Sequence, residues 1–419
     1  MLLKNAKLYG QEGLWDIEIQ AEKINSIKVA EKRTGAADEP TIDLNGKLVL
    51  PPYVEPHIHL DYVLTAGTPR WSTSGSVFEG IEIWSERKQL INESKEDIKK
   101  RAMKAIEMQL KHGIQHTRTH VDVSDPSLKG LKALLEVKEE IRPWMDLQLV
   151  ALPQEGLYTK PDGEELLIKA LEMGADVVGG IPHYELTRED GVRSVMKALE
   201  LAVKYDKLVD IHCDEIDDDQ SRYLEVLAGE ALKLGIGHLV TASHTTAMAS
   251  YSNAYTYKLF QTLRKANINF VSLPKANLHL QGRFDGHPAR RGVTRVKEMV
   301  AENINVCFGL DSIMDPWYPL GDGNLMSVVD TGLHACHMTD YAHIVKALDL
   351  ITVNGAKTLA IEEGYGVKEG HQANLIVLDS ESEYEAIRTQ AAVLYSIRNG
   401  NVMVETKPAQ TTMDIPLFS

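Results

Sequence analysis

The 419-residue sequence is poor in cysteine and has no long apolar runs, and each shortage excludes a class of protein. Its three cysteines, Cys213, Cys307 and Cys336, are odd in number and far apart, which excludes a disulfide framework and fits a reducing compartment. No apolar run is long enough to span a bilayer, and the first residues lack the apolar segment of a signal peptide. We therefore expect a cytoplasmic protein with no membrane partner.

Basic clusters are also missing. The chain has 45 Lys and Arg against 60 Asp and Glu, a net charge of -15, and this excess of acid argues against a nucleic-acid partner. The composition, 43% hydrophobic and 25% charged, is that of a globular protein. At this length the chain can bury a large core, either as one large domain or as a large and a small one.

Short strand-like runs alternate with helical stretches through most of the chain. The eight runs are LVLPPYVEPHIHL, GIQHTRTHVDV, DLQLVALPQE, ADVVGGIPHYE, KLVDIHCDE, HLVTASHTT, NFVSLPKANLHL and INVCFGLDS. The segments between them, such as SLKGLKALLEVKEEI, space their apolar residues as amphipathic helices do. Eight repeats of strand and helix predict an α/β fold, a parallel (β/α)8 TIM-type barrel over residues 51–365. The long gap between the first two runs leaves room for an additional loop and helix at the barrel mouth.

The two ends of the chain have a different character. Residues 1–50 and 366–419 contain short runs typical of antiparallel strands, with an Asn-Gly turn at Asn399 and Gly400. We expect these ends to meet as one small β-sandwich domain beside the barrel.

The first barrel strand ends in two histidines, His57 and His59. Residues two apart on a strand point to the same face, so both rings can enter the barrel. Their position is the carboxyl end of a strand, where barrel enzymes carry their chemistry. Burying two imidazoles is costly unless a metal ion or hydrogen bonds engage them.

Four later strands end in residues of related chemistry. These are Gln154 on the third strand, His212 and Glu215 on the fifth, His244 on the sixth, and Asp311 and Ser312 on the eighth. Taken singly, Asp311 fits a helix cap, His244 a hydrogen-bonded core residue and Gln154 a polar loop residue. Together, at one end of separate strands, they indicate an active site.

Three imidazoles and one carboxylate can hold a divalent transition metal and leave a position for water. Such an ion brings the pKa of its water close to neutrality. Glu215 and His244 would then carry protons beside it. We expect a metal-dependent hydrolase.

The sequence resembles the amidohydrolase superfamily and, within it, the bacterial cytosine deaminase branch. The similarity runs nearly end to end, through EPHIHLD, FEGIE, THVDVSD, LQLVALPQEG, HCDEIDD, VTASHTTAM, HLQGRFD, RRGVTRVKEM and DPWYPLG. The resemblance implies that His57, His59, His212 and Asp311 ligate one metal ion per chain, Fe(II) or Zn(II). Binuclear relatives use a lysine from the fourth strand, and ADVVGGIPHYE has none, which favours a mononuclear site. The resemblance also implies a homo-oligomer.

The same resemblance implies roles for the remaining residues. Glu215 would protonate ring nitrogen 3 of a pyrimidine, while His244 and Asp311 orient and deprotonate the water that attacks carbon 4. Gln154 would bind the ring carbonyl and a ring N–H. Trp317 either forms a wall of the substrate pocket or packs as an aromatic at the barrel mouth.

One departure from the branch concerns the substrate. Cytosine deaminases commonly read FGHDD where this chain reads FGLDS, so Leu310 and Ser312 replace a histidine and an aspartate. In the family, that aspartate lies near ring carbon 5. Serine removes its charge and leaves room for a methyl group, so we expect a deaminase of 5-methylcytosine as well as cytosine.

Several alternatives remain on sequence grounds alone. If Ser312 is neutral drift, the protein is a plain cytosine deaminase. The same machinery would serve other cyclic amidines such as creatinine, isocytosine or isoguanine, and the barrel also suits cyclic-amide hydrolases. A non-catalytic metal-binding scaffold is disfavoured, because metal binding alone requires neither Glu215 nor His244.

Overall fold

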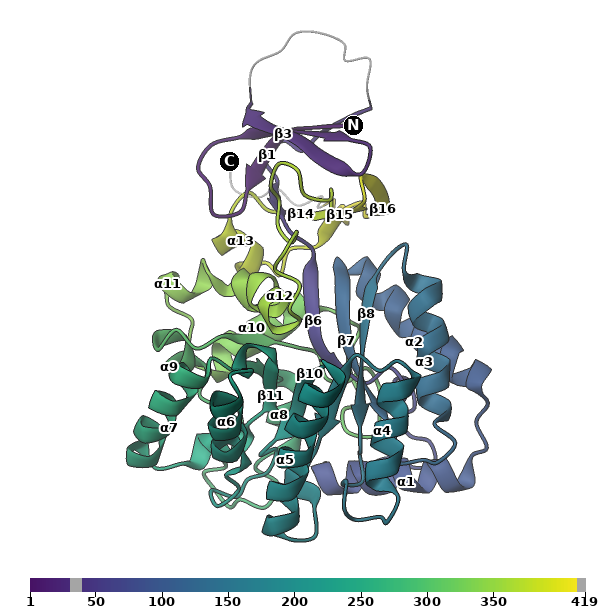
Figure 1. The fold of residues 1–419 in the computed structure, drawn as a ribbon. Coiled ribbons are helices and arrows are strands. Elements are labelled where there is room, and N and C mark those ends of the chain that lie inside the picture. The colour runs from purple at the N-terminus through teal and green to yellow at the C-terminus, as the bar shows by residue number, and fades with distance from the viewer. Residues whose placement is uncertain (31–39, 413–419) are drawn as a thin grey trace. The chain divides into compact units, whose positions relative to one another are not determined.

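The computed structural model describes residues 1–30 and 40–412. It divides into two compact units, Met1–Pro52 with Gly366–Ser419, and Tyr53–Tyr365 (Figure 1). The larger unit carries every side chain that the sequence assigns to the site.

The larger unit is built on eight parallel strands. They are β6 (Tyr53–Ile58), β7 (Ile114–Asp122), β8 (Asp146–Leu152), β9 (Val177–Gly180), β10 (Leu208–Cys213), β11 (Val240–His244), β12 (Asn269–Ser272) and β13 (Val306–Phe308). Each strand pairs with its neighbour in chain order, and a parallel bridge between Ile58 and Asp311 links the first strand to the segment after the last. With helices between the strands, this arrangement confirms the predicted (β/α)8 barrel.

Helices connect the barrel strands. They are α1 (Val77–Leu90), α2 (Lys95–Lys111), α3 (Lys129–Ile141), α4 (Gly163–Met173), α5 (Arg188–Tyr205), α6 (Tyr223–Leu234), α7 (Asn253–Ala266), α8 (Pro274–Leu280), α9 (Val296–Ala301), α10 (Leu325–Ala335), α11 (Tyr341–Ile344) and α12 (Val353–Thr358). The long gap after β6 holds α1 and α2, as expected. Side-chain caps begin both helices: Ser76 accepts from the backbone of Glu79, and Ser94 forms a capping box with Asp97.

A charged layer lies inside the barrel. Arg118 on β7 is fully buried and donates to the Asp210 carboxylate at 2.9 Å and to Thr241 at 3.2 Å. It also donates to Gln148 on β8 and to the carbonyl of Thr358. A buried guanidinium is tolerated only when it is paired and its donors are satisfied, and here four partners meet that requirement.

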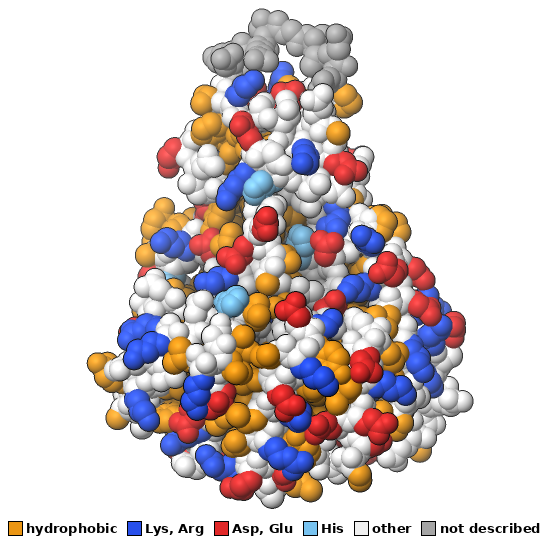
Figure 2. Space-filling view, in the orientation of Figure 1, with side chains coloured by type: hydrophobic (Ala, Val, Ile, Leu, Met, Phe, Trp, Pro, Cys, Tyr) orange, Lys and Arg blue, Asp and Glu red, His pale blue; other side chains and the backbone are white. Residues whose placement is uncertain are grey.

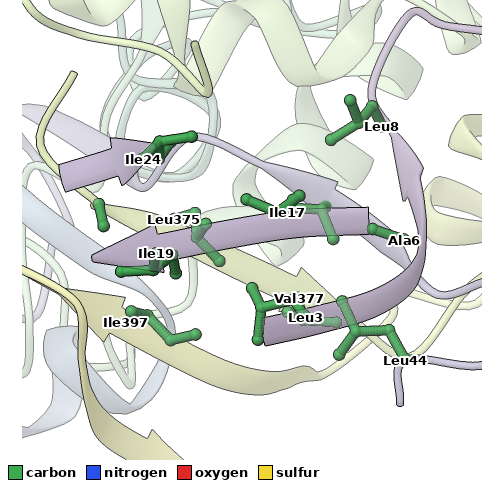
Figure 3. Close-up of a cluster of buried hydrophobic side chains, with 12 residues drawn as sticks. Leu3, Ala6, Leu8, Ile17, Ile19, Ile24, Leu44, Leu375, Val377 and Ile397 are labelled. Carbon is green, nitrogen blue, oxygen red and sulfur yellow. The ribbon is translucent and has the colours of Figure 1, made fainter. Parts of the chain in front are cut away.

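The smaller unit combines both chain ends. Its strands are β1 (Leu2–Leu8), β2 (Trp15–Gln20), β3 (Lys23–Val29), β4 (Thr41–Asp43), β5 (Leu48–Leu50), β14 (Leu375–Leu378), β15 (Val393–Arg398) and β16 (Asn401–Glu405), with one helix, α13 (Glu383–Arg388). They form one continuous sheet through β1, whose pairing shifts between Leu3 and Ala6. Apolar side chains from both ends share one core, including Ile17, Leu375 and Ile397 (Figure 3). The predicted Asn-Gly turn joins β15 to β16, with φ of 48° and 74°.

Among the described residues, no helix is long and apolar enough to cross a bilayer. On the face shown in Figure 2, acidic and basic side chains are interspersed and no basic stripe stands out among the coloured residues.

Candidate active site

Strand ends bring the four predicted ligands together. His57 lies on β6 and His59 directly after it, while His212 lies on β10 and Asp311 follows β13. The Nε2 atoms of His57 and His59 are each 3.5 Å from Oδ1 of Asp311. The Nε2 atoms of His59 and His212 are 3.2 Å apart. All four residues are buried, and their donor atoms lie close together in the barrel interior.

This donor set fits one metal ion. A tetrahedral ion with bonds of about 2.1 Å keeps its ligand atoms about 3.4 Å apart, and the three separations above agree with that spacing. Nε2 of His57 has no hydrogen-bond partner among the described residues, although it is fully buried. Such an orphaned nitrogen is costly unless it binds something.

Burial also sets the charge of these rings. It lowers the pKa values of His57 and His212 well below the usual range, and neighbouring histidines lower them further. Burial lowers the pKa of His59 as well, although Asp311 opposes that shift. The rings are therefore neutral and offer lone pairs, as metal ligands must.

Glu215 and His244 form a hydrogen-bonded pair beside the four ligands. Nδ1 of His244 is 3.0 Å from Oε1 of Glu215, and both are buried. Burial raises the pKa of Glu215, with His244 opposing the rise. Although burial lowers the pKa of His244, Glu215, Asp311 and Asp210 together raise it, and the net shift is upward. The Asn277 amide donates to Glu215 at 3.4 Å and lies 3.1 Å from His244. The pair can therefore hold a proton and pass it on.

Three of these side chains, those of Glu215, His244 and Asp311, lie at or directly after residues with unusual backbone conformations. Strand alternation places Ser243 inward and His244 outward, but His244 and Thr245 have φ of 68° and 47°. Asp311 has φ of 67°, and Asp214, just before Glu215, has φ of 52°. Non-glycine residues adopt this left-handed conformation at a cost, and it recurs at functional sites. Each of these turns lies at or next to a side chain that lines the site cavity.

A cavity opens on this cluster. Its lining consists of His59, Tyr62, Val77, Gln154, Ile181, His212, Glu215, His244, Leu280, Asp311, Ser312 and Trp317. Every predicted site residue except His57 is in this set, and His57 lies beneath it, fully buried. Leu310 is buried but does not line the cavity.

The cavity has an aromatic wall and one amide. The ring of Tyr62 stacks on His59 at 4.5 Å and lies 4.7 Å from the ring of Trp317. The Tyr62 hydroxyl is 3.4 Å from Oε1 of Gln154. A flat ring can slide along such a wall while the amide donates and accepts hydrogen bonds at its edge.

Ser312 faces the cavity with a buried carboxyl behind it. Asp315, whose buried carboxyl lies near Ser312, accepts from the backbone N–H groups of Trp317 and Tyr318. Burial raises the pKa of Asp315 to about 8, and these hydrogen bonds oppose the rise.

The sequence did not reveal every residue at the site. His120 on β7 lies 3.9 Å from His57, ring centre to ring centre, and with His57 and His212 it forms a second possible ligand group. His120 lies two residues after Arg118 on the same strand, so strand alternation points both side chains into the barrel. This spacing could have indicated it. Tyr62 and Asn277 carry no such signal, because a tyrosine in a loop and an asparagine on a short helix are common.

Comparisons with known proteins agree with this geometry. The family model described as "Amidohydrolase family" matches residues 40–404. N-isopropylammelide isopropyl amidohydrolase from Pseudomonas sp. (strain ADP) is 31% identical over 415 residues, covering 97% of each chain.

Solved structures extend the comparison. Two crystal structures of 5-methylcytosine deaminase from Klebsiella pneumoniae, liganded with 5-fluorocytosine and with phosphonocytosine, are each 54% identical. Their TM-scores are 0.96 and 0.95, and the matches cover 99% of this chain and 99% and 100% of theirs. N-isopropylammelide isopropylaminohydrolase from Burkholderia multivorans, 22% identical over 96% of this chain and 98% of its own with a TM-score of 0.82, shares the fold.

Proposed function

Because this chain belongs to the amidohydrolase family, we propose that it is a metal-dependent aminohydrolase that converts 5-methylcytosine to thymine and cytosine to uracil, releasing ammonia. The observation that carries the proposal is Ser312 on the wall of a cavity that also contains Gln154 and Glu215. The 54% identity to the Klebsiella deaminase supports the same substrate class.

In this proposal His57, His59, His212 and Asp311 hold one divalent ion. Imidazole nitrogen and carboxylate oxygen suit both Fe(II) and Zn(II), so either ion fits the set. β9 carries no lysine, which supports a single ion. When bound, the ion supplies Lewis-acid activation of water.

Glu215 and His244 manage the protons. The buried Glu215 carboxyl, with its raised pKa, holds a proton and delivers it to ring nitrogen 3, which makes carbon 4 electrophilic. His244 receives the proton that the attacking water loses, since its Nδ1 is fixed by Glu215 and its Nε2 has no hydrogen-bond partner among the described residues. His244 then returns its proton to the amino nitrogen on carbon 4, the hydroxyl formed at carbon 4 returns its proton to Glu215, and the C–N bond breaks to release ammonia and leave a carbonyl at carbon 4.

The cavity wall positions the ring. Gln154 donates to the carbonyl at carbon 2 and accepts from the N–H at position 1. Trp317 and Tyr62 contact the flat face of the ring, and Ser312 lies near carbon 5. Because position 312 on the cavity lining is a serine, a methyl group on carbon 5 does not meet a carboxylate at this position.

Ammonia release from a substrate panel tests the function. Metal-loaded protein is assayed with cytosine, 5-methylcytosine, isocytosine, isoguanine, creatinine, N-isopropylammelide and a hydantoin, and products are identified by mass. We expect thymine and uracil, with much slower reaction of the others. Turnover confined to another cyclic amidine, or ring opening of the hydantoin without ammonia, would reassign the enzyme.

The cytoplasmic location and the homo-oligomeric state are part of the same proposal. They rest on the resemblance to cytosine deaminases. Size-exclusion chromatography with light scattering measures the oligomeric state directly, and a monomer under assay conditions would overturn that part.

A further inference from the structure

We propose that Ser243 and Asp210 are positioning residues that hold His57 in the one tautomer able to bind a metal ion. The inference rests on the proposed function, because it assigns a role to two residues that support the metal ligand His57 and do not bind the ion themselves. Neither residue lines the cavity, so neither would contact a substrate.

The evidence is a chain of short hydrogen bonds inside the barrel. Nδ1 of His57 is 2.9 Å from Oγ of Ser243. The Ser243 hydroxyl donates to Oδ1 of Asp210 at 2.6 Å. Oδ2 of the same carboxylate accepts from Arg118 at 2.9 Å. All four side chains are 0% exposed, so water does not compete for these bonds.

The direction of the bonds fixes the proton on His57. A serine hydroxyl has a single hydrogen, and Ser243 gives it to Asp210. Its oxygen can then only accept from His57, so Nδ1 of His57 carries the ring proton. The lone pair therefore lies on Nε2, the atom 3.5 Å from Asp311. The opposite tautomer would present an N–H to the ion and could not bind it.

Arg118 keeps Asp210 able to accept. A neutral Asp210 would leave the fully buried guanidinium of Arg118 without a compensating charge, which is strongly unfavourable. The carboxylate therefore stays ionised, and the direction of both hydrogen bonds follows.

Three strands contribute to this support. Arg118 comes from β7, Asp210 from β10 and Ser243 from β11, while His57 is on β6. Residues on packed strands have little freedom, so the support is rigid. Mutation of a residue that hydrogen-bonds to a metal-binding histidine and fixes its orientation typically weakens metal affinity about 10- to 100-fold.

Metal affinity of Ser243 variants tests the proposal without using substrate. Metal-depleted protein is titrated with Zn²⁺ against a chromophoric chelator, and the dissociation constant is compared with that of the native chain. Ser243→Ala should weaken binding about 10- to 100-fold. Ser243→Thr keeps the hydroxyl and should recover most of the loss.

Ser272→Ala is the matched control. Ser272 is also fully buried on a barrel strand, β12, but its hydroxyl has no hydrogen-bond partner among the described residues. Its removal should leave zinc affinity unchanged. Native affinity in Ser243→Ala, or equal losses in Ser272→Ala, would overturn the proposal. If Ser243→Ala weakens zinc binding as expected but the native protein deaminates no pyrimidine, only the proposed function is overturned.

Discussion

At the scale of single residues, the site depends on buried groups whose partners are few and specific. Glu215 is hydrogen-bonded to His244 and Asn277. His59 stacks on Tyr62 and directs Nε2 toward Asp311 and His212. Substitutions at these two positions therefore separate proton transfer from metal binding.

Glu215→Gln should preserve folding and metal content but abolish most turnover. The amide can still contact Asn277 and His244, yet it cannot deliver a proton to the ring. Positioned acid–base groups contribute about 10²- to 10⁴-fold, so kcat should fall by at least that factor. Steady-state kinetics and metal analysis check this, and near-native turnover would show that another group protonates the ring.

His59→Ala should lose bound metal and activity together. Removing one of four donors leaves an incomplete tetrahedral set, so metal binding should weaken strongly. Elemental analysis after purification and after chelator treatment measures the loss. Stoichiometric metal retained by the variant would contradict the ligand assignment, as would two tightly bound ions per native chain.

At the scale of elements, α1 packs closely against the aromatic wall of the cavity. A Cβ added at Gly80 would lie 2.5 Å from Cδ1 and Nε1 of Trp317, far inside contact distance. The lack of a side chain at Gly80 therefore lets the helix approach Trp317. Helix α1 also supplies Val77 to the cavity lining.

Gly80→Ala should therefore displace Trp317 or α1 and raise KM for the pyrimidine. Gly229→Ala in α6 is the control, because a Cβ there meets nothing within 4 Å. Alanine favours a helix over glycine by about 1 kcal/mol, so the control should gain stability and keep native kinetics. Steady-state KM and thermal unfolding of both variants test this, and an unchanged KM in Gly80→Ala would show that the wall tolerates the shift.

Elements also show what the sequence could and could not predict. The recurring strand and helix pattern correctly predicted the (β/α)8 barrel, and strand alternation led to the prediction that His57 and His59 point into it. Alternation alone would have turned His244 outward, and only the left-handed backbone at His244 and Thr245 brings it in. Local sequence does not encode that turn. The hydrogen bonds that fix His57 join residues of three other strands. The sequence around Ser243 alone therefore did not indicate its role.

At the scale of the whole molecule, the described site belongs to the larger unit alone. The smaller unit has its own core, made from both chain ends (Figure 3). The division predicted from the sequence, residues 1–50 with 366–419 against residues 51–365, stays a prediction about domains. Limited proteolysis would test it.

The central claim is that this chain deaminates 5-methylcytosine because position 312 is a serine. The most direct test is kcat/KM for cytosine and 5-methylcytosine in the native protein and in Ser312→Asp. Ser312→Asn separates size from charge, which matters because a carboxylate at 312 would also face Asp315. A pocket's response to one methyl group is worth about 1–3 kcal/mol, or roughly 10- to 200-fold.

We predict that the native protein uses both bases and that Ser312→Asp loses 5-methylcytosine by at least about 10-fold more than cytosine. Ser312→Asn should show a smaller loss in the same direction. Equal losses on both bases in Ser312→Asp, or no native activity on 5-methylcytosine, would contradict the account.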